Sequence, residues 1–596
     1  MRLFGSILVE QIIPELKENG VMFYYDSAIR EEHIPEIREI FLSHVLSFIQ
    51  PIYLDGEDAE TFMPENNHLY FVITLNEPKR EILKQAIINI PSEKLKRFFV
   101  LTPLDGLEYV IFIDDIIRQN LVYLFPNMEI SGVYSIKFNR DAELHLTDEY
   151  HGSLLTKINK QLKKRDFGPP SRFLYENGMP ENLLLFLASA FKADYDEIFA
   201  GGRYHNLRDF SSFPDFNKNL SYKKLKPLSS ANVMNSGDIF NILTTQDVLL
   251  HIPYQSYNPV LSFFNQAAVD TDVTEIFITL YRVASESHIV NALISAAKNG
   301  KKVTAFIELK ARFDEANNIR WGKIMKQAGV KIIYSIPNLK VHSKIALVIK
   351  RKGKQTNSYA ILSTGNFNEI TAQLYTDHVL MTTDKSIISE LHQLFMFLQK
   401  KDKSVVDSKL EFEALLVSQF NLIGRFEDLI NAEIKKAENG QEAFIRIKIN
   451  NLEEHHFIDS LYKASRAGVK INLIVRSICC LVPGVKQLSE NITVKRLVDR
   501  YLEHSRIFIF GAGSNPELII GSSDLMNRNL YHRIEVCVPV KAEGLKNELI
   551  DYFEIQWRDN DKAVTLASDM SQDKPVADQE EILNAQQTIY EYLQKR

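Results

Sequence analysis

Two short segments of the chain carry the same pair of chemically active side chains. His342 and Lys344 lie two residues apart, directly before the apolar run 345–349. Residues i and i+2 of a strand point to the same face, so both side chains can act on one site. His504 and Arg506 precede a second apolar run, 162 residues after the first histidine (504 minus 342). A single histidine of this kind is usually a packing residue, whereas two copies favour a functional role.

Two histidines with neighbouring cations suit the transfer of a phosphoryl group. One imidazole can attack phosphorus while the other gives or takes the proton of the leaving group. An imidazole is partly unprotonated near neutral pH and needs no strong base to act as a nucleophile. Lysine and arginine side chains balance the negative charge of the transition state. We therefore expect one active site to which both copies contribute.

The elements that position these residues alternate between strands and helices. The first copy has predicted strands at 275–281, 302–308 and 331–335 and predicted helices at 287–298 and 318–327. The second copy repeats this order with predicted elements at 443–449, 456–466 and 470–475. Such alternation is typical of a sheet that helices cover on both faces, so we predict an internal duplication of an α/β half.

Length and composition limit the class of protein. At about 100–200 residues per domain, a chain of 596 residues predicts roughly three to five domains. With 45% hydrophobic and 24% charged residues, it is typical of soluble globular proteins, and a net charge of −6 argues against coating of nucleic acid. We find no signal-peptide pattern, no apolar run of the ~18 residues that span a bilayer, and three cysteines without metal-site spacing. We expect a cytoplasmic protein, with peripheral attachment at the inner membrane face left open.

The pattern divides the chain into four parts. Residues 1–225 mix helical and strand-like patterns and predict an α+β head domain. The two α/β halves follow at 226–402 and 403–565. A tail at 566–596 ends in a predicted helix of the kind that packs on the body of a protein.

A basic segment in the predicted head domain is a second candidate for phosphate binding. A Gly-Gly pair precedes Arg203 and His205, with Arg172 and Arg208 nearby in the sequence. Paired glycines let backbone amides approach a phosphate, and the neighbouring cations would bind it. The alternative is a basic surface turn.

The duplicated segments resemble the phospholipase D superfamily, whose motif is His-x-Lys, an Asp five residues beyond the Lys, then Gly-Ser-x-Asn. Here the two Asp positions hold Ile349 and Gly511, and Arg506 replaces the second Lys. Asn366 ends the polar corner of the first copy, and we expect it to bind the same phosphate as Arg506. The resemblance implies two tandem phospholipase D-like α/β domains, but the missing Asp residues argue against ordinary phosphodiesterase activity.

Longer motifs resemble bacterial polyphosphate kinase of the phosphohistidine type. They are TLYR at 279–282, ELKARFDE at 308–315, LKVHSK at 339–344, TGNFN at 364–368, LYTD at 374–377 and DRYLEHSR at 499–506. The resemblance implies reversible transfer of the ATP γ-phosphate to the end of an inorganic polyphosphate chain. ATP, ADP and polyphosphate are then the partners, and the expected assembly is a homo-oligomer, either a dimer or a tetramer.

The resemblance also implies roles for individual residues. His342 would be the nucleophile that becomes phosphorylated, with Lys344 beside it. His504 would be the facing acid/base or the group that orients phosphate. Tyr375, Arg476 and His504 match positions that contact ATP; the alternatives are an aromatic core residue for Tyr375 and a surface arginine for Arg476.

Two further arginines match positions that the family associates with Mg²⁺, namely Arg282 and Arg312. An arginine cannot ligate a cation through its protons, so we expect both to hold phosphates that carry the ion. The alternative is an ion pair with Glu308, Asp314 or Glu315.

The beginning of the chain differs from the family pattern. Family members usually open with a helical domain that helps hold adenine, whereas Met1 here enters what looks like the following domain. We expect either a fragment or a member without that domain. Two alternatives to a kinase remain open: a non-catalytic or impaired polyphosphate-binding protein, and a phospholipase D-like phosphodiesterase.

Overall fold

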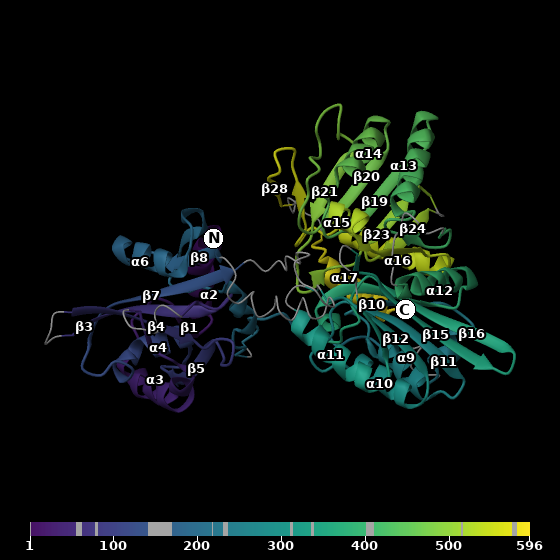
Figure 1. Ribbon diagram of the computed structural model, residues 1–596. Helices are drawn as coiled ribbons and strands as arrows, with labels where there is room; N and C mark the ends of the chain where they lie inside the picture. The colour runs from purple at the N-terminus through teal and green to yellow at the C-terminus, as the bar shows by residue number, and fades with distance from the viewer. Residues whose placement is uncertain are drawn as a thin grey trace. The chain divides into compact units, whose positions relative to one another are not determined.

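Two mixed sheets with the same strand order carry the histidine segments in the computed structural model (Figure 1). The first runs β10 (Val248–Ile252), β17 (Tyr375–Thr382), β16 (Gln355–Ser363), β15 (Lys344–Lys352), β11 (Val273–Leu280), β12 (Lys302–Ile307) and β13 (Lys331–Tyr334). The second runs β18 (Leu416–Val417), β26 (Val536–Pro539), β24 (Glu517–Gly521), β23 (Ile507–Phe510), β19 (Phe444–Ile449), β20 (Lys470–Val475) and β21 (Ile492–Arg496), then β27 (Val564–Leu566) and β28 (Gln572–Asp573).

Corresponding strand pairs of the two sheets also agree in direction. Strands β11, β12 and β13 are parallel to one another, as are β19, β20 and β21. The remaining corresponding pairs are antiparallel in both sheets. The mixed α/β class and the internal duplication predicted from the sequence are therefore confirmed.

The chain separates into two compact units, Met1–Lys223 and Lys224–Arg596. The structure describes residues 2–54, 62–77, 82–140, 170–216, 218–229, 237–309, 311, 314–334, 339–400, 410–513, 516–574 and 581–596. Both duplicated sheets belong to the second unit, and the finer boundaries at 225, 402 and 565 stay predictions. Among the described residues, no helix has both the length and the apolar character that a membrane span requires.

Helices cover both faces of the first sheet. Successive strand residues point to opposite sides of a sheet, and apolar residues on both sides of these strands must be buried. Figure 1 shows α9 (Asn258–Val269), α10 (His288–Lys298) and α11 (Glu315–Gln327) together, with α12 (Lys385–Gln399) opposite. On the α12 face, the Phe395 ring lies 5.4 Å from that of Phe277 and 5.5 Å from that of Phe306. Helix α10 begins where the sequence predicts, because the Ser287 side chain accepts a hydrogen bond from the Val290 amide.

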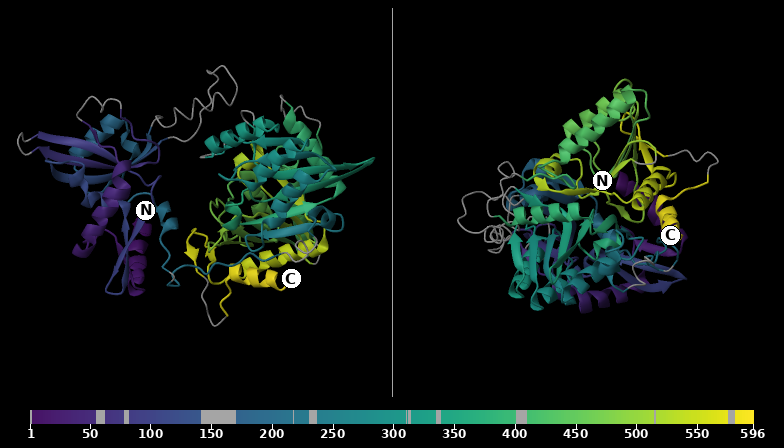
Figure 2. Two further views of the ribbon diagram at one scale, coloured as in Figure 1. Left: turned by 90° about the horizontal axis from the view of Figure 1, so that it is seen from below. Right: turned by 90° about the vertical axis from the view of Figure 1, so that its right-hand side faces the viewer.

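One hydrophobic core joins the two halves. Leu347 of β15 and Ile509 of β23 belong to the same buried cluster as α12, α16 (Glu543–Trp557) and the C-terminal helix α17 (Ala585–Gln594). In both views of Figure 2 this yellow C-terminal helix runs along the body of the second unit. Helix α17 contributes Ile589 and Leu593 to the core. The tail helix therefore packs on the protein, as predicted.

The first unit contains two further sheets. One has the order β1 (Val21–Tyr24), β6 (Leu107–Phe112) and β5 (Phe98–Leu104). The other has the order β2 (Ile52–Tyr53), β4 (Ile82–Ile90), β3 (Leu69–Glu77), β7 (Glu129–Arg140), β8 (Pro170–Glu176) and β9 (Ile198–Gly201). Helix α6 (Glu181–Phe191) packs on β7 and β8, where the Phe138 and Phe173 rings stack at 4.5 Å.

Truncating the core side chain of the tail helix should destabilise the second unit. Ile589 is fully buried, and Ile589→Ala should cost about 2–5 kcal/mol, since it leaves a cavity. Both tryptophans, Trp321 and Trp557, lie in the second unit, so their fluorescence during urea unfolding reports on that unit. Ile582 is 72% exposed, and Ile582→Ala should leave the midpoint of urea unfolding unchanged within experimental error. Equal midpoints for the two variants would contradict this packing.

Candidate active site

The backbone around His342 is fixed by a short parallel pairing of β14 (Lys340–Val341) with β25 (Arg533–Ile534). The amides of His342 and Ser343 both donate to the Ile534 carbonyl, at 2.9 Å each. The His342 Nδ1 atom lies 2.8 and 2.9 Å from the two carboxylate oxygens of Glu535. The Tyr281 ring meets the imidazole edge to face at 4.5 Å. The ring of His342 is therefore held from two sides.

His504 is held in the same way by the opposite half. Strand β22 (Leu502–Glu503) pairs in parallel with β17, which places Thr376 beside Glu503. The His504 Nδ1 atom then lies 2.9 and 3.0 Å from the carboxylate oxygens of Asp377. The two histidine segments thus exchange partners, because each histidine is bound by a carboxylate of the other half.

Each of these carboxylates is fixed by a hydroxyl group 13 residues earlier in the chain. Thr364 donates to Asp377 at 2.5 Å, and Ser522 donates to Glu535 at 2.5 Å. Asn529 adds a hydrogen bond of 2.7 Å to Glu535. Burial alone would raise the pKa of Glu535, but His342 and its hydrogen bond hold that pKa at about 2. Both carboxylates are therefore anions that accept hydrogen bonds at neutral pH.

This arrangement turns Nε2 of each imidazole away from its carboxylate, and the Arg506 guanidinium lies 3.4 Å from the Nε2 atom of His504. Because the carboxylate accepts from Nδ1–H, the lone pair is on Nε2. Burial lowers the pKa of His342, and it also lowers that of His504, where Arg506 and Lys344 add to the effect. Both rings are thus neutral and oriented, which is the state that a nucleophilic imidazole requires.

The cations of the two copies, Lys344 and Arg506, lie beside the histidines. The Lys344 ammonium donates to the His342 carbonyl and lies 5.2 Å from the centre of the Tyr281 ring. Its burial lowers the pKa of Lys344 to about 7. Arg506 donates to Asp524 at 3.2 Å and, across the halves, to the Thr364 carbonyl at 3.2 Å. The site therefore contains a fixed guanidinium and a buried amine.

Three other predicted residues surround His504 or the corner next to it. The Tyr375 ring lies 5.2 Å from the imidazole. Arg476 donates to Asn450 at 3.1 Å, and Asn450 in turn donates to the His504 carbonyl at 3.2 Å. The Asn366 Oδ1 atom is buried, and no group of the described residues donates to it. Tyr375, Arg476 and Asn366 therefore belong to the second unit's site by position, and their binding roles stay predictions.

The two arginines expected near Mg²⁺ are only partly described. Arg282 pairs with Asp314 at 3.0 Å, which is one of the ion pairs foreseen as an alternative, and Arg312 lies outside the described residues. The described part of the chain holds no cluster of three or more His, Cys, Asp or Glu side chains that suits a metal ion.

Arg203 and His205 belong to the first unit. Arg203 lies 3.2 Å from Asp26 and 3.3 Å from Asp115. His205 is buried, and its Nε2 contacts the Ser135 carbonyl at 3.2 Å. Burial lowers the pKa of His205 to about 4, so the ring is neutral near pH 7. Phosphate binding by this pair stays a prediction, and Arg203 has carboxylate partners of its own.

Three family models match the chain: the polyphosphate kinase middle domain at residues 32–213, C-terminal domain 1 at 238–404 and C-terminal domain 2 at 415–586. The chain belongs to the polyphosphate kinase family. This result confirms the resemblance seen in the sequence.

Individual polyphosphate kinases are similar along nearly the whole chain. The protein of Vibrio cholerae is 36% identical over 594 residues, which cover 98% of this chain and 84% of that protein. The Escherichia coli protein is 34% identical over 598 residues, covering 98% and 86% respectively. The crystal structure of polyphosphate kinase from Porphyromonas gingivalis has a TM-score of 0.85 at 36% identity, covering all of this chain and 88% of that one.

Sequence analysis missed the roles of Asp377 and Glu535. Asp377 was noted only as the end of a family motif, and Glu535 was not noted at all. A signal was present, because each acid follows the hydroxyl residue of its polar corner by 13 positions. Aligning the two copies strand by strand would have placed both acids at equivalent positions in the polyphosphate kinase repeat.

A methyl group at Gly365 should displace the acid that holds His504. A Cβ atom there would lie 2.1 Å from Asp377 Oδ2, which is far too close for the carboxylate to stay in place. Separating the buried pair should cost about 3–5 kcal/mol in Gly365→Ala, measured by the same tryptophan-monitored urea unfolding. Gly544→Ala is the control, since its Cβ would meet nothing within 4 Å. If the Gly365→Ala protein were as stable as the control, the predicted clash between the added methyl group and Asp377 would be refuted.

Because Glu535 is ionised in the folded protein, the stability of the protein should depend on pH. Because the pKa of Glu535 in the folded protein, about 2, lies below the ordinary value of 4.5, its contribution to stability is complete above about pH 4.5 and is lost as the pH falls toward 2. The difference in melting temperature between the wild type and Glu535→Gln should therefore be large at about pH 6 and smaller at about pH 3. Glu438 is exposed, and Glu438→Gln serves as the control. A difference that grows in acid would contradict the assignment.

Proposed function

We propose that this chain transfers the γ-phosphate of ATP reversibly to the end of an inorganic polyphosphate chain, with His342 as the residue that carries the phosphoryl group. Membership of the polyphosphate kinase family supports the overall reaction. The observation that supports the residue assignment is the reciprocal fixing of His342 by Glu535 and of His504 by Asp377.

In the first step, Nε2 of His342 attacks the γ-phosphorus of ATP. The N–P bond forms, the bond from phosphorus to the bridging β,γ-oxygen breaks, and ADP leaves with that oxygen and its electron pair. Positive charge builds on the imidazole as it becomes phosphorylated. The Glu535 carboxylate, 2.8 Å from Nδ1, stabilises this charge without any rearrangement.

In the second step, a terminal oxygen of the polyphosphate chain attacks the phosphohistidine. The new P–O bond forms as the N–P bond breaks, and its electron pair returns to Nε2. The Nε2 atom of His504 takes a proton from a protonated terminal phosphate in this direction and returns it in the reverse direction. Asp377, bound to Nδ1, stabilises the imidazolium that results.

The remaining predicted residues provide charge and positioning. Arg506 and Lys344 face the transferred phosphate, while Arg476 and Tyr375 contact the nucleotide. Mg²⁺ on the phosphates of ATP would neutralise part of their charge, and we expect Arg282 to hold those phosphates. We also predict that the protein is a homo-oligomer in the cytoplasm, where it can attach peripherally to a membrane.

The core packing does not favour a phosphodiesterase. At one of the two positions where that superfamily has an Asp, the chain carries Ile349, which is 6% exposed within the hydrophobic core. The other position is Gly511. A polyphosphate-binding protein without activity would bind the polymer but form no phosphohistidine, which the following experiment tests.

Removing His342 should abolish the covalent intermediate. With γ-labelled ATP and Mg²⁺, we expect acid-labile, base-stable label on the wild-type protein and none on His342→Ala. Glu535→Gln should slow labelling by about a hundredfold, because the imidazole loses its fixed anion. His456 is exposed on α14 (His455–Arg466), and His456→Ala should label normally. Undiminished label on His342→Ala would refute the assignment of the nucleophile.

A further inference from the structure

A cavity of about 630 Å³ lies beside the six-stranded sheet of the first unit. Strands β7 and β8 pair so that Lys137 is opposite Leu174 and Asn139 is opposite Arg172. Because residues i and i+2 share a face, these four side chains line the same side of the sheet, away from the core under α6. The volume is within the ~300–1,000 Å³ of small-molecule sites.

The described lining of this cavity is cationic and contains no acid. Besides Lys137 and Arg172 it includes the amides of Asn139, Asn177 and Asn206. The remaining lining residues are aromatic, small or neutral, and none of the described ones is an Asp or a Glu. An anion in the cavity would therefore meet two positive charges and three amide groups without facing a lining carboxylate.

Lys137 is buried, and no carboxylate of the described residues lies within ion-pair distance of its ammonium. Its side chain is 8% exposed, and its ammonium makes one hydrogen bond among the described residues, 3.2 Å to Asn206 Oδ1. Desolvation lowers the pKa of Lys137; the negative charge of Asp209 opposes this effect, and the positive charge of Arg172 adds to it. An ammonium has three donors, so two remain for a ligand. A buried cation of this kind is stabilised when an anion binds beside it.

Arg172 is the second cation of the cavity. Its guanidinium lies over the Phe199 ring at 5.3 Å, and no carboxylate of the described residues forms an ion pair with it. Arg203, which the sequence suggested for this role, pairs with Asp26 and Asp115 instead. The cations that are available to a phosphate are thus Lys137 and Arg172.

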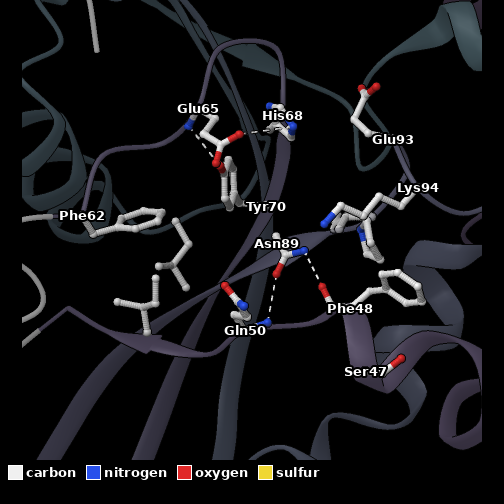
Figure 3. A pocket seen from close by; sticks show the side chains of 14 residues that line it. Ser47, Phe48, Gln50, Phe62, Glu65, His68, Tyr70, Asn89, Glu93 and Lys94 are labelled. Atoms are coloured by element: carbon white, nitrogen blue, oxygen red, sulfur yellow. Dashed lines mark hydrogen bonds and ion pairs between the residues drawn. The ribbon is translucent and has the colours of Figure 1, made fainter. Parts of the chain in front are cut away.

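A different cavity of the same unit shows what an unselective lining looks like. Figure 3 shows a hollow of about 240 Å³ in which Glu65 and Glu93 lie along with His68 and Lys94. Its central amide, Asn89, is already bonded to the backbone of Phe48 and Gln50. That hollow offers charges of both signs, and it carries no comparable preference for an anion.

We propose that the cavity between Lys137 and Arg172 is a second binding site for a short run of phosphoanhydride-linked phosphates, separate from the histidine pair. The choice of ligand rests on the proposed function, because a polyphosphate chain is the polyanion that such an enzyme handles. Bidentate contacts from Arg172 and donors from Lys137 and the amides would bind successive phosphates. The site would hold part of the polymer while its end reacts elsewhere.

Hydrogen–deuterium exchange of the full chain tests this site without relying on turnover. Saturating inorganic tripolyphosphate, without nucleotide and at constant ionic strength, should protect the segments 134–140, 170–177 and 200–207. Lys137→Met and Arg172→Gln should each raise the concentration needed for this protection about tenfold or more, as expected for the loss of a charge-assisted contact. Arg38 is exposed on α3 (Ile34–Ile40), and Arg38→Gln should behave like the wild type.

The outcomes separate this proposal from the proposed function. No protection of these segments in the wild type, or equal protection in both cavity variants, would overturn the second site while labelling of His342 stays intact. Protection by ATP but not by tripolyphosphate would also overturn it, because the ligand would then be a nucleotide. If Lys137→Met fails to fold, Arg172→Gln decides, since its side chain is only half-buried.

Discussion

The arrangement of the second unit's candidate site depends on one exchange: each of the two histidines is bound by a carboxylate from the opposite half. His342 contacts Glu535, and His504 contacts Asp377, at 2.8–3.0 Å. Neither contact can form unless the two sheets are held in a fixed relation. The shared core of α12, α16 and α17 provides that relation, and Arg506 adds a direct bond to the Thr364 carbonyl. Hydrophobic packing around the two histidine segments thus decides the orientation of both imidazoles.

The charges in this site are expensive to bury and therefore sensitive to their partners. Burying a carboxylate without a cation or hydrogen-bond donors lowers the stability of the folded protein by several kcal/mol, whereas a carboxylate with all its partners is tolerated. Glu535 meets this condition through His342, Ser522 and Asn529. Each of these bonds forms without substrate, so the proposed phosphorylation of His342 would need little reorganisation of its partners.

The sequence predicted what is encoded locally. The order of strands and helices and both histidines follow from short patterns, and the duplication follows from comparing those patterns. The acids were missed because Glu535 is 193 residues from His342, and only tertiary packing brings them together. The sequence suggested Arg172 and the Gly-Gly pair for phosphate but missed Lys137, because only strand pairing places Lys137 near Arg172. Arg312 could not be assessed, because it is outside the described residues.

The reciprocal contacts have the geometry of an isologous interface. In a symmetric dimer, a residue i that touches j implies that j touches i in the partner, and here that rule holds within one polypeptide. A half with only His342 and Asp377 would have a histidine and an acid that cannot reach each other, yet two copies would complete two equivalent pairs. The duplication therefore preserves in one chain a self-complementary surface.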